Sequence, residues 1–175
     1  DRTLYERFVA PLEPRMMKSI WRVVRHPDLA EDALQDALLT IWRKLDRIRD
    51  HPCPEALVLK IALNSACDIL RKRKRLLRHE ESYSEGEGPG GEDAFARRLE
   101  DKEIEGRVLG AIARLPKQQA AAVLLRIVEE QPYDAVAKAL RCSEATARIH
   151  VSRGRARLIR WLAPLAAPRR TGENR

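Results

Sequence analysis

The stretch from residue 131 to residue 163, QPYDAVAKALRCSEATARIHVSRGRARLIRWLA, constrains the fold more than any other part of the chain. Its pattern predicts two helices joined by a tight turn. Asp134 lies in the first turn of a short helix, Arg141 and Cys142 form the turn, and Ser143 caps the next helix. In that second helix, small and apolar residues recur at helical spacing and predict a narrow buried stripe: Ala147, Val151, Gly154 and Leu158. The pattern is typical of a helix-turn-helix.

Basic residues cover most of the remaining surface of this second helix: Arg148, His150, Arg153, Arg155 and Arg157. A helix that packs through small residues and turns arginines outward suits the major groove, where guanidinium groups pair with phosphates or with guanine edges. The alternative interpretation is a solvated basic helix at the end of a bundle. The pattern favours DNA binding.

The composition agrees with a nucleic-acid partner and a helical fold. The chain has 175 residues, a net charge of +8 and a pI near 9.8, which favours a polyanionic partner. Aromatic residues are only 5% and no run of alternating β-branched residues occurs, so we expect an all-α protein. No apolar stretch approaches the ~20 residues that span a bilayer, so direct membrane insertion is not expected. Cys53, Cys67 and Cys142 fit no zinc or disulfide pattern, which favours the reducing cytoplasm.

The chain divides into two halves around an acidic, glycine-rich seam. We predict a first helical domain over residues 1–78, a flexible acidic linker over 79–103, a second helical domain over 104–163 and a disordered tail over 164–175. Each domain is shorter than ~80 residues, so neither buries a large core. The expected architecture is therefore two small helical domains on a tether.

The first half predicts three main helices. One covers 4–24 with an interruption near Pro11 and Pro14. A second begins after Pro27 and runs to Arg47, with an apolar face of Leu34, Leu38, Ile41 and Leu45. Acidic and amide side chains line another side of that second helix, and they include Asp28, Glu31, Asp32, Gln35 and Asp36. These acids complement the helix dipole, or they form a docking edge for a basic protein helix. Asp36 lies beyond the first turn, so the helix dipole does not account for it and the docking edge does.

A third helix begins at Pro54, a favourable first helical position, and runs into the basic block RKRKRLLR. Its buried side carries Val58, Ile61, Ala62, Ala66, Ile69 and Leu70. Its opposite side is one continuous polar face made of Lys60, Asn64, Asp68, Arg71 and Arg75. Asparagine and arginine can read base edges, and the basic cluster can neutralise phosphates. The alternative is a solvated outer face followed by a basic tail.

Nothing in the sequence points to catalysis. The four histidines are scattered, no Ser/His/Asp or paired-carboxylate arrangement occurs, and the glycines at 86–91 lie in an acidic context that does not suit phosphate binding. We therefore predict a non-enzymatic protein with no cofactor and no metal site.

Three blocks of the chain resemble the extracytoplasmic-function (ECF) sigma factors of the sigma-70 family. AEDALQDALLTIWRKL resembles the family's polymerase-binding helix, and IALNSACDILRKRKR resembles the helix that follows it. AIARLPKQQAAAVLLRIVEEQPYDAVAKALRCSEATARIHVSRGRARL resembles the C-terminal domain. The opening segment LYERFVAPLEPRMMKSIWRVV also bears a faint resemblance to the sigma factor of a cobalt–nickel resistance system.

The resemblance implies a promoter-specific transcription initiation factor. Its partners would be core RNA polymerase (β′ clamp helices and β flap), promoter DNA and an anti-sigma factor, which can be membrane-anchored. The implied polymerase-binding residues are Glu31, Asp32, Gln35 and Asp36, and the implied −10 residues are Lys60, Asn64, Asp68, Arg71 and Arg75. The implied −35 residues are Ser143, Thr146, Arg148, Ile149, His150 and Arg153.

The chain departs from the family pattern at positions that bear on DNA preference. Ala145 stands where the family has a turn glycine, and Ile149-His150 replaces Ser-Arg, so the −35 preference need not follow the family. Two other functions remain open. A stand-alone helix-turn-helix regulator would bind duplex DNA without polymerase, and a sigma mimic would capture an anti-sigma factor without needing the RKRKR block.

Overall fold

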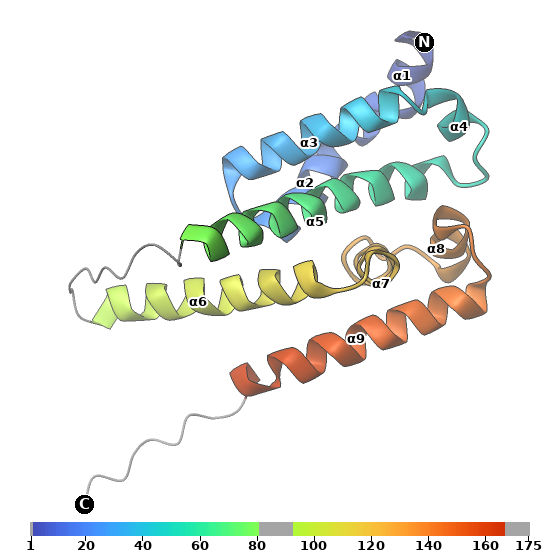
Figure 1. Cartoon of the computed structure of the whole chain (residues 1–175). Helices are drawn as coiled ribbons and strands as arrows, with labels where there is room; N and C mark the ends of the chain where they lie inside the picture. Colours follow the sequence, from blue (N-terminus) through green and yellow to red (C-terminus); the bar gives the residue numbers. More distant parts are fainter. Residues whose placement is uncertain (1, 81–92, 167–175) are drawn as a thin grey trace, which may run out of the picture.

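The computed structural model describes residues 2–80 and 93–166, and every regular element in those residues is a helix (Figure 1). The all-α prediction is confirmed. Helix α5 (Pro54–Glu80) lies in the middle of the molecule, with α2 (Glu13–Val24) and α3 (Pro27–Trp42) against one side and the C-terminal helices against the other. Buried residues from both halves of the chain belong to one contiguous hydrophobic core.

Prolines divide the first segment as the sequence predicts. Helix α1 (Arg2–Phe8) ends before the short 3₁₀ helix η1 (Ala10–Leu12), and α2 begins at Glu13 with Pro14 in its first turn. Helix α2 ends at Val24, followed by Arg25 in the left-handed region with φ of 54°.

The second predicted helix is two helices. Helix α3 ends at Trp42, Lys44 leaves the helical region with φ of −122° and ψ of 18°, and α4 covers Leu45–Arg49. The predicted apolar face is also only partly right. Leu34 and Leu38 are half-buried, and the fully buried stripe of α3 consists mainly of alanines: Ala30, Ala33, Ala37 and Ile41. Small residues let α3 pack closely against both α2 and α5.

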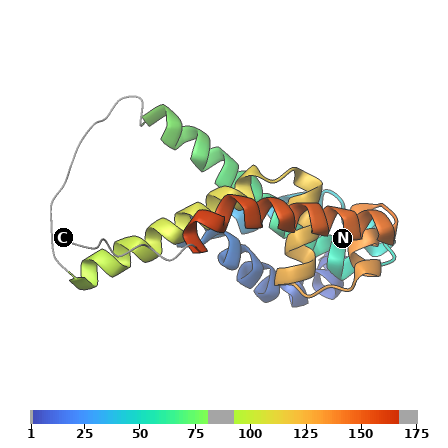
Figure 2. The ribbon, with the colours of Figure 1, turned by 90° about the horizontal axis from the view of Figure 1, so that it is seen from below.

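The C-terminal half contains α6 (Asp93–Arg114), α7 (Lys117–Val123), the π-helix η2 (Leu124–Val128), α8 (Tyr133–Leu140) and α9 (Glu144–Ala166). Figure 2 shows α9 crossing α7 and following the C-terminal part of α6. Within residues 2–80 and 93–166, no helix is long and apolar enough to cross a membrane.

Helix α6 begins inside the segment that the sequence predicts to be a linker. Residues 93–103 are helical. Glu103 and Arg107 are one helical turn apart and form an ion pair at 3.2 Å that supports the helix. Helix α5 also extends into the predicted linker, to Glu80, and the remaining residues of that linker, 81–92, lie outside the described residues. Helix α9 likewise extends past Ala163 to Ala166, and the predicted tail beyond it lies outside them too.

Candidate nucleic-acid interface

The turn between α8 and α9 has the geometry that the sequence predicts. Arg141 adopts the left-handed conformation (φ 57°, ψ 49°), and the amide of Cys142 donates to the carbonyl of Ala137 at 3.0 Å. The Ser143 hydroxyl accepts a hydrogen bond from the backbone amide of Thr146 at 3.1 Å, which makes Ser143 the N-cap of α9. A helix-turn-helix is therefore present at residues 133–166.

Helix α9 is anchored through a narrow stripe of small residues. Ala147, Val151 and Gly154 are buried, and Leu158 is half-buried. A Cβ at Gly154 would lie 2.5 Å from Cγ2 of Val123, so the glycine permits the close approach of α9 to α7. Because the anchoring stripe is narrow, most of the α9 surface stays free.

The predicted −35 residues lie on that free surface. Ser143, Arg148, Ile149 and Arg153 are exposed, while Thr146 and His150 are half-buried. The guanidinium of Arg148 stands 4.1 Å above the ring of Tyr133 and 3.6 Å from the carboxylate of Glu144. Arg153 makes no ion pair with any residue that the structure describes, so its charge is available to an external anion.

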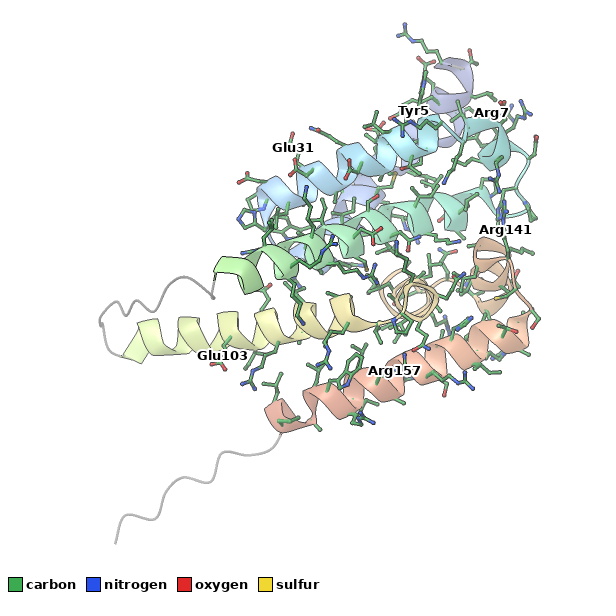
Figure 3. The ribbon with its side chains drawn as sticks, viewed as in Figure 1. Tyr5, Arg7, Glu31, Glu103, Arg141 and Arg157 are labelled. Atoms are coloured by element: carbon green, nitrogen blue, oxygen red, sulfur yellow. The ribbon has the colours of Figure 1, made fainter. Side chains whose placement is uncertain are left out.

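The acidic edge of α3, which consists of Glu31, Asp32, Gln35 and Asp36, is exposed along its whole length. In Figure 3 the Glu31 side chain points away from α5 into solvent. None of the four side chains makes an ion pair with another described residue. Exposed acids without internal partners are available to a basic partner surface.

The acidic edge continues into an exposed apolar surface formed by Leu39 and Trp42. Leu39 is 56% exposed and Trp42 is 51% exposed, and the Trp42 ring packs at 5.8 Å from the ring of Tyr5. Leu39 follows Asp32 by seven residues, and Trp42 follows Leu39 by three, so the spacing places them on the same side of the helix as the acids. The spacing in the sequence therefore indicates that these apolar residues lie beside the acids.

The polar face of α5 is partly covered by the C-terminal half: Lys60, Asn64 and Arg71 are half-buried, and Asp68 and Arg75 are exposed. Lys60 donates from Nζ to the carbonyl of Ala139 at 2.9 Å. Arg71 donates from Nε to the carbonyl of Ala113 at 3.1 Å and from Nη2 to that of Leu115 at 3.0 Å. Asp68 pairs with Arg71 at 2.7 Å and with Lys117 at 3.3 Å. Asn64 is half-buried, and Arg75, near the end of the face, is exposed.

Burial changes the electrostatics of this face. Desolvation lowers the pKa of Lys60, and the nearby positive charges of Arg141 and Lys44 lower it further. Two of the cations that were predicted to meet DNA, Lys60 and Arg71, lie at the junction of the two halves. The polar pattern along α5 carries no signal of which element covers it.

A second polar cluster at the junction was not predicted. Glu129 is only 6% exposed, and its carboxylate accepts hydrogen bonds from Nε of Arg15 at 3.0 Å and from the Ser19 hydroxyl. Arg22 donates to the carbonyl of Val128 at 3.0 Å. We call Glu129, Arg15, Ser19 and Arg22 the Glu129 cluster; it joins α2 to the end of η2.

Comparison with known proteins identifies the family. Residues 8–76 match the family described as "Sigma-70 region 2", and residues 105–158 match "Sigma-70, region 4". The chain belongs to the sigma-70 family. It is an ECF sigma factor, a promoter-specific initiation factor of transcription.

Similar proteins carry the same description over most of the chain. The RNA polymerase sigma factor CarQ of Myxococcus xanthus is 28% identical over 161 residues, which are 92% of this sigma factor and 90% of CarQ. The ECF sigma factor SigM of Mycobacterium tuberculosis is 32% identical over 136 residues, 78% of this chain and 65% of SigM.

A solved structure shares the fold. The sigma factor RpoE of Bartonella quintana, crystallised with the anti-sigma factor NepR, has a TM-score of 0.53 and 23% identity, and the match covers 91% of this sigma factor and 96% of RpoE.

Proposed function

We propose that this sigma factor binds core RNA polymerase through α3 and directs it to promoters whose −35 element is read by α9 and whose −10 element is read by α5. The observation that carries the proposal is the exposed surface of α9 on a complete helix-turn-helix, with its turn at Arg141 and its N-cap at Ser143. In this arrangement, Ile149, His150 and Arg153 face base edges, and Arg148 meets a phosphate.

The polymerase contact is supported by the acidic edge of α3. Asp32 and Asp36 are exposed and unpaired among the described residues, which suits a basic helix of the β′ clamp. Leu39 and Trp42 would extend that contact with apolar area. The C-terminal half would dock on the β flap. Because its polymerase partner is cytoplasmic, we place this sigma factor in the cytoplasm.

An anti-sigma factor is the expected regulator. The neighbouring RpoE structure contains the anti-sigma factor NepR, and we propose a partner of that kind here. Membrane anchoring of that partner is a separate proposal, and it would be tested by finding whether the captured partner is extracted only with detergent.

Run-off transcription with core polymerase on a library of random promoters tests the proposed function. The sigma factor is compared with an Asp32→Lys/Asp36→Lys variant and with a Glu6→Lys/Asp46→Lys control. The control makes the same change in net charge at exposed acids outside the acidic edge. The surface ion pairs that Glu6 and Asp46 form contribute little to stability.

We expect transcripts from templates that share two spaced motifs, lost with the α3 variant and kept with the control. Binding to duplex DNA without transcripts would replace the proposal with the stand-alone helix-turn-helix regulator. Capture of an anti-sigma factor with neither DNA binding nor transcripts would replace it with the sigma mimic.

A further inference from the structure

We propose that a cavity beside the C-terminal half of α5 binds a small organic anion with an apolar body. The cavity has a volume of about 870 Å³ and is lined by residues of α2, α5, α6 and α9 and of the turn after α2. Figure 1 shows α6 between α5 and the end of α9. The volume lies within the range of small-molecule sites in proteins. This inference goes beyond the proposed function, because no residue implied in polymerase or promoter binding lines the cavity.

Two glycines of α6 leave room for a ligand. Gly106 and Gly110 are four residues apart, so they lie on the same side of the helix, and both line the cavity. A Cβ at Gly106 would meet nothing within 4 Å, and a Cβ at Gly110 would meet Nζ of Lys74 at 3.8 Å. Glycine is less favourable than alanine inside a helix, and no close approach of another helix requires it at these two positions. What the two glycines provide is the space beside them.

Part of the wall is apolar. Val24 of α2 and Leu70 of α5 are buried, and Leu109 of α6 is half-buried. Trp161 of α9 is also half-buried, and the guanidinium of Arg114 lies 4.5 Å from the centroid of its ring. Aliphatic and aromatic side chains of this kind bury the body of a small ligand.

The charged groups on the wall favour an anion. Five lysine and arginine side chains line the cavity, against two carboxylates. Both carboxylates are neutralised by cations of the same wall: Glu103 pairs with Arg107 at 3.2 Å, and Glu105 pairs with Arg25 at 3.6 Å. The remaining positive charge therefore has no carboxylate on the wall to balance it.

Two of the other cations are available to a ligand. Arg73 is exposed on α5, and neither Arg73 nor Arg114 makes an ion pair within residues 2–80 and 93–166. A guanidinium that stacks on an aromatic ring, as Arg114 does on Trp161, keeps its N–H groups free to pair with a carboxylate, sulfonate or phosphate. We expect the head group of the ligand to pair with these guanidinium groups and its body to lie against the apolar part of the wall.

The test measures binding of anilinonaphthalene sulfonate (ANS), which combines an aromatic body with a sulfonate and fluoresces when an apolar site binds it. Its affinity for the full chain is determined by fluorescence titration at fixed salt. Gly110→Leu fills the cavity, and Ala156→Leu adds the same side chain at an exposed position of α9 that does not line it. Arg73→Gln removes a cation of the wall, and Arg75→Gln removes a cation of the same helix that lies outside the wall. Circular dichroism confirms that each variant folds, since ANS also binds loosely packed chains.

We expect Gly110→Leu to weaken ANS binding about ten-fold and Arg73→Gln to weaken it about five-fold, whereas both controls bind ANS as the parent chain does. If Gly110→Leu does not fold, Gly106→Leu decides, because its Cβ meets open space. The proposal is overturned if the folded cavity-filling variant binds ANS as tightly as Ala156→Leu, or if Arg75→Gln loses as much affinity as Arg73→Gln.

Competition identifies the body of the ligand. Decanoate carries an aliphatic body and naphthyl phosphate an aromatic one, and displacement of ANS by either supports the proposal and shows which body fits. Displacement by inorganic phosphate at the same ionic strength would overturn the proposal, because charge alone would then be enough for binding. None of these measurements uses polymerase or promoter DNA, so their outcome is independent of the proposed function.

Discussion

Helices α5 and α9 have similar sequences in one respect and opposite surroundings in the structure. Each carries a stripe of buried residues and an opposite side rich in cations, and the sequence predicts a DNA-reading face on both. In the structure the polar face of α5 is partly covered by α6, α7 and α8, whereas the corresponding side of α9 is open. Periodicity therefore identifies which residues share a face, but it does not tell what lies against that face.

The difference follows from where each helix packs. Helix α5 lies between two groups of helices and contributes to both. Helix α9 lies at the edge of the molecule and is anchored mainly by Ala147, Val151 and Gly154. A central helix has polar residues on covered sides only where partners satisfy them, and here the partners are carbonyls at helix ends.

The largest expected effect comes from removing arginines on the exposed side of α9. Arg148→Ala combined with Arg153→Ala should weaken binding of the sigma factor–polymerase complex to its promoter about a hundredfold, roughly 3 kcal/mol in total, through loss of −35 contacts. A filter or anisotropy assay on a promoter selected by run-off transcription measures it. The control Arg2→Ala/Lys18→Ala removes the same charge elsewhere, and an equal loss there would contradict a specific role for α9.

The contacts that partly cover the polar face of α5 should contribute to the free energy of unfolding. Arg71→Ala should lower the free energy of unfolding by about 2 kcal/mol, because it leaves the carbonyls of Ala113 and Leu115 without their charged donor. Arg75→Ala, one turn further along and exposed, should change it by less than about 0.5 kcal/mol. Urea unfolding measures both. Equal effects at the two positions would mean that the polar face of α5 is not covered in solution.

Two glycine-to-alanine changes, one in the anchor of α9 and one in α6, should change stability in opposite directions. Gly154→Ala should destabilise the chain by about 1 kcal/mol, because overpacking against Val123 outweighs the gain in helix propensity. Gly106→Ala has open space around its Cβ and should stabilise by about 0.5 kcal/mol. Thermal unfolding compares them, and a stabilising Gly154→Ala would show that α9 does not pack closely on α7.

The smallest expected effect is a loss of stability at alkaline pH that comes from Tyr5 in α1. Burial raises the pKa of Tyr5 from 10.0 to about 12, with a further contribution from its hydrogen bond to Glu13. The folded state therefore holds the phenol proton more tightly, so this stability is present below pH 10 and is lost as the pH rises towards 12.

Tyr5→Phe should lose less stability than the parent chain between about pH 9 and pH 11.5. Burial also raises the pKa of Cys67 to about 11, but that thiol is present in both chains. The difference in unfolding free energy between the two chains, measured by urea unfolding at each pH, therefore isolates Tyr5, and an identical pH dependence would contradict its half-buried hydrogen bond to Glu13.

Local chemistry was predictable from the sequence because it depends on a few neighbouring residues. Ser143 predicted the N-cap of α9, Pro54 predicted the start of α5, and the prolines predicted the break between α1 and α2. The small residues of α9 predicted its anchoring stripe, since only the buried side of a helix needs them.

Contacts between distant segments were not predictable in the same way. Nothing near Lys60 in the sequence signals that Ala139 accepts its hydrogen bond, and nothing near Glu129 signals Arg15. The break at Lys44 was missed because apolar spacing continues from α3 into α4. The start of α6 was missed because the linker suggested by the acids and glycines at 81–92 was predicted to continue to residue 103, whereas α6 begins at Asp93.

Hydroxyl-radical footprinting of one selected promoter tests most directly whether α5 and α9 differ in their access to promoter DNA. The free sigma factor and its complex with core polymerase are compared at matched concentrations. We expect protection limited to the upstream element for the free chain and protection of both elements for the complex, because α9 is open whereas Lys60 and Arg71 of α5 are bonded to the C-terminal half. Equal protection of both elements by the free chain, or protection of only one by the complex, would contradict it.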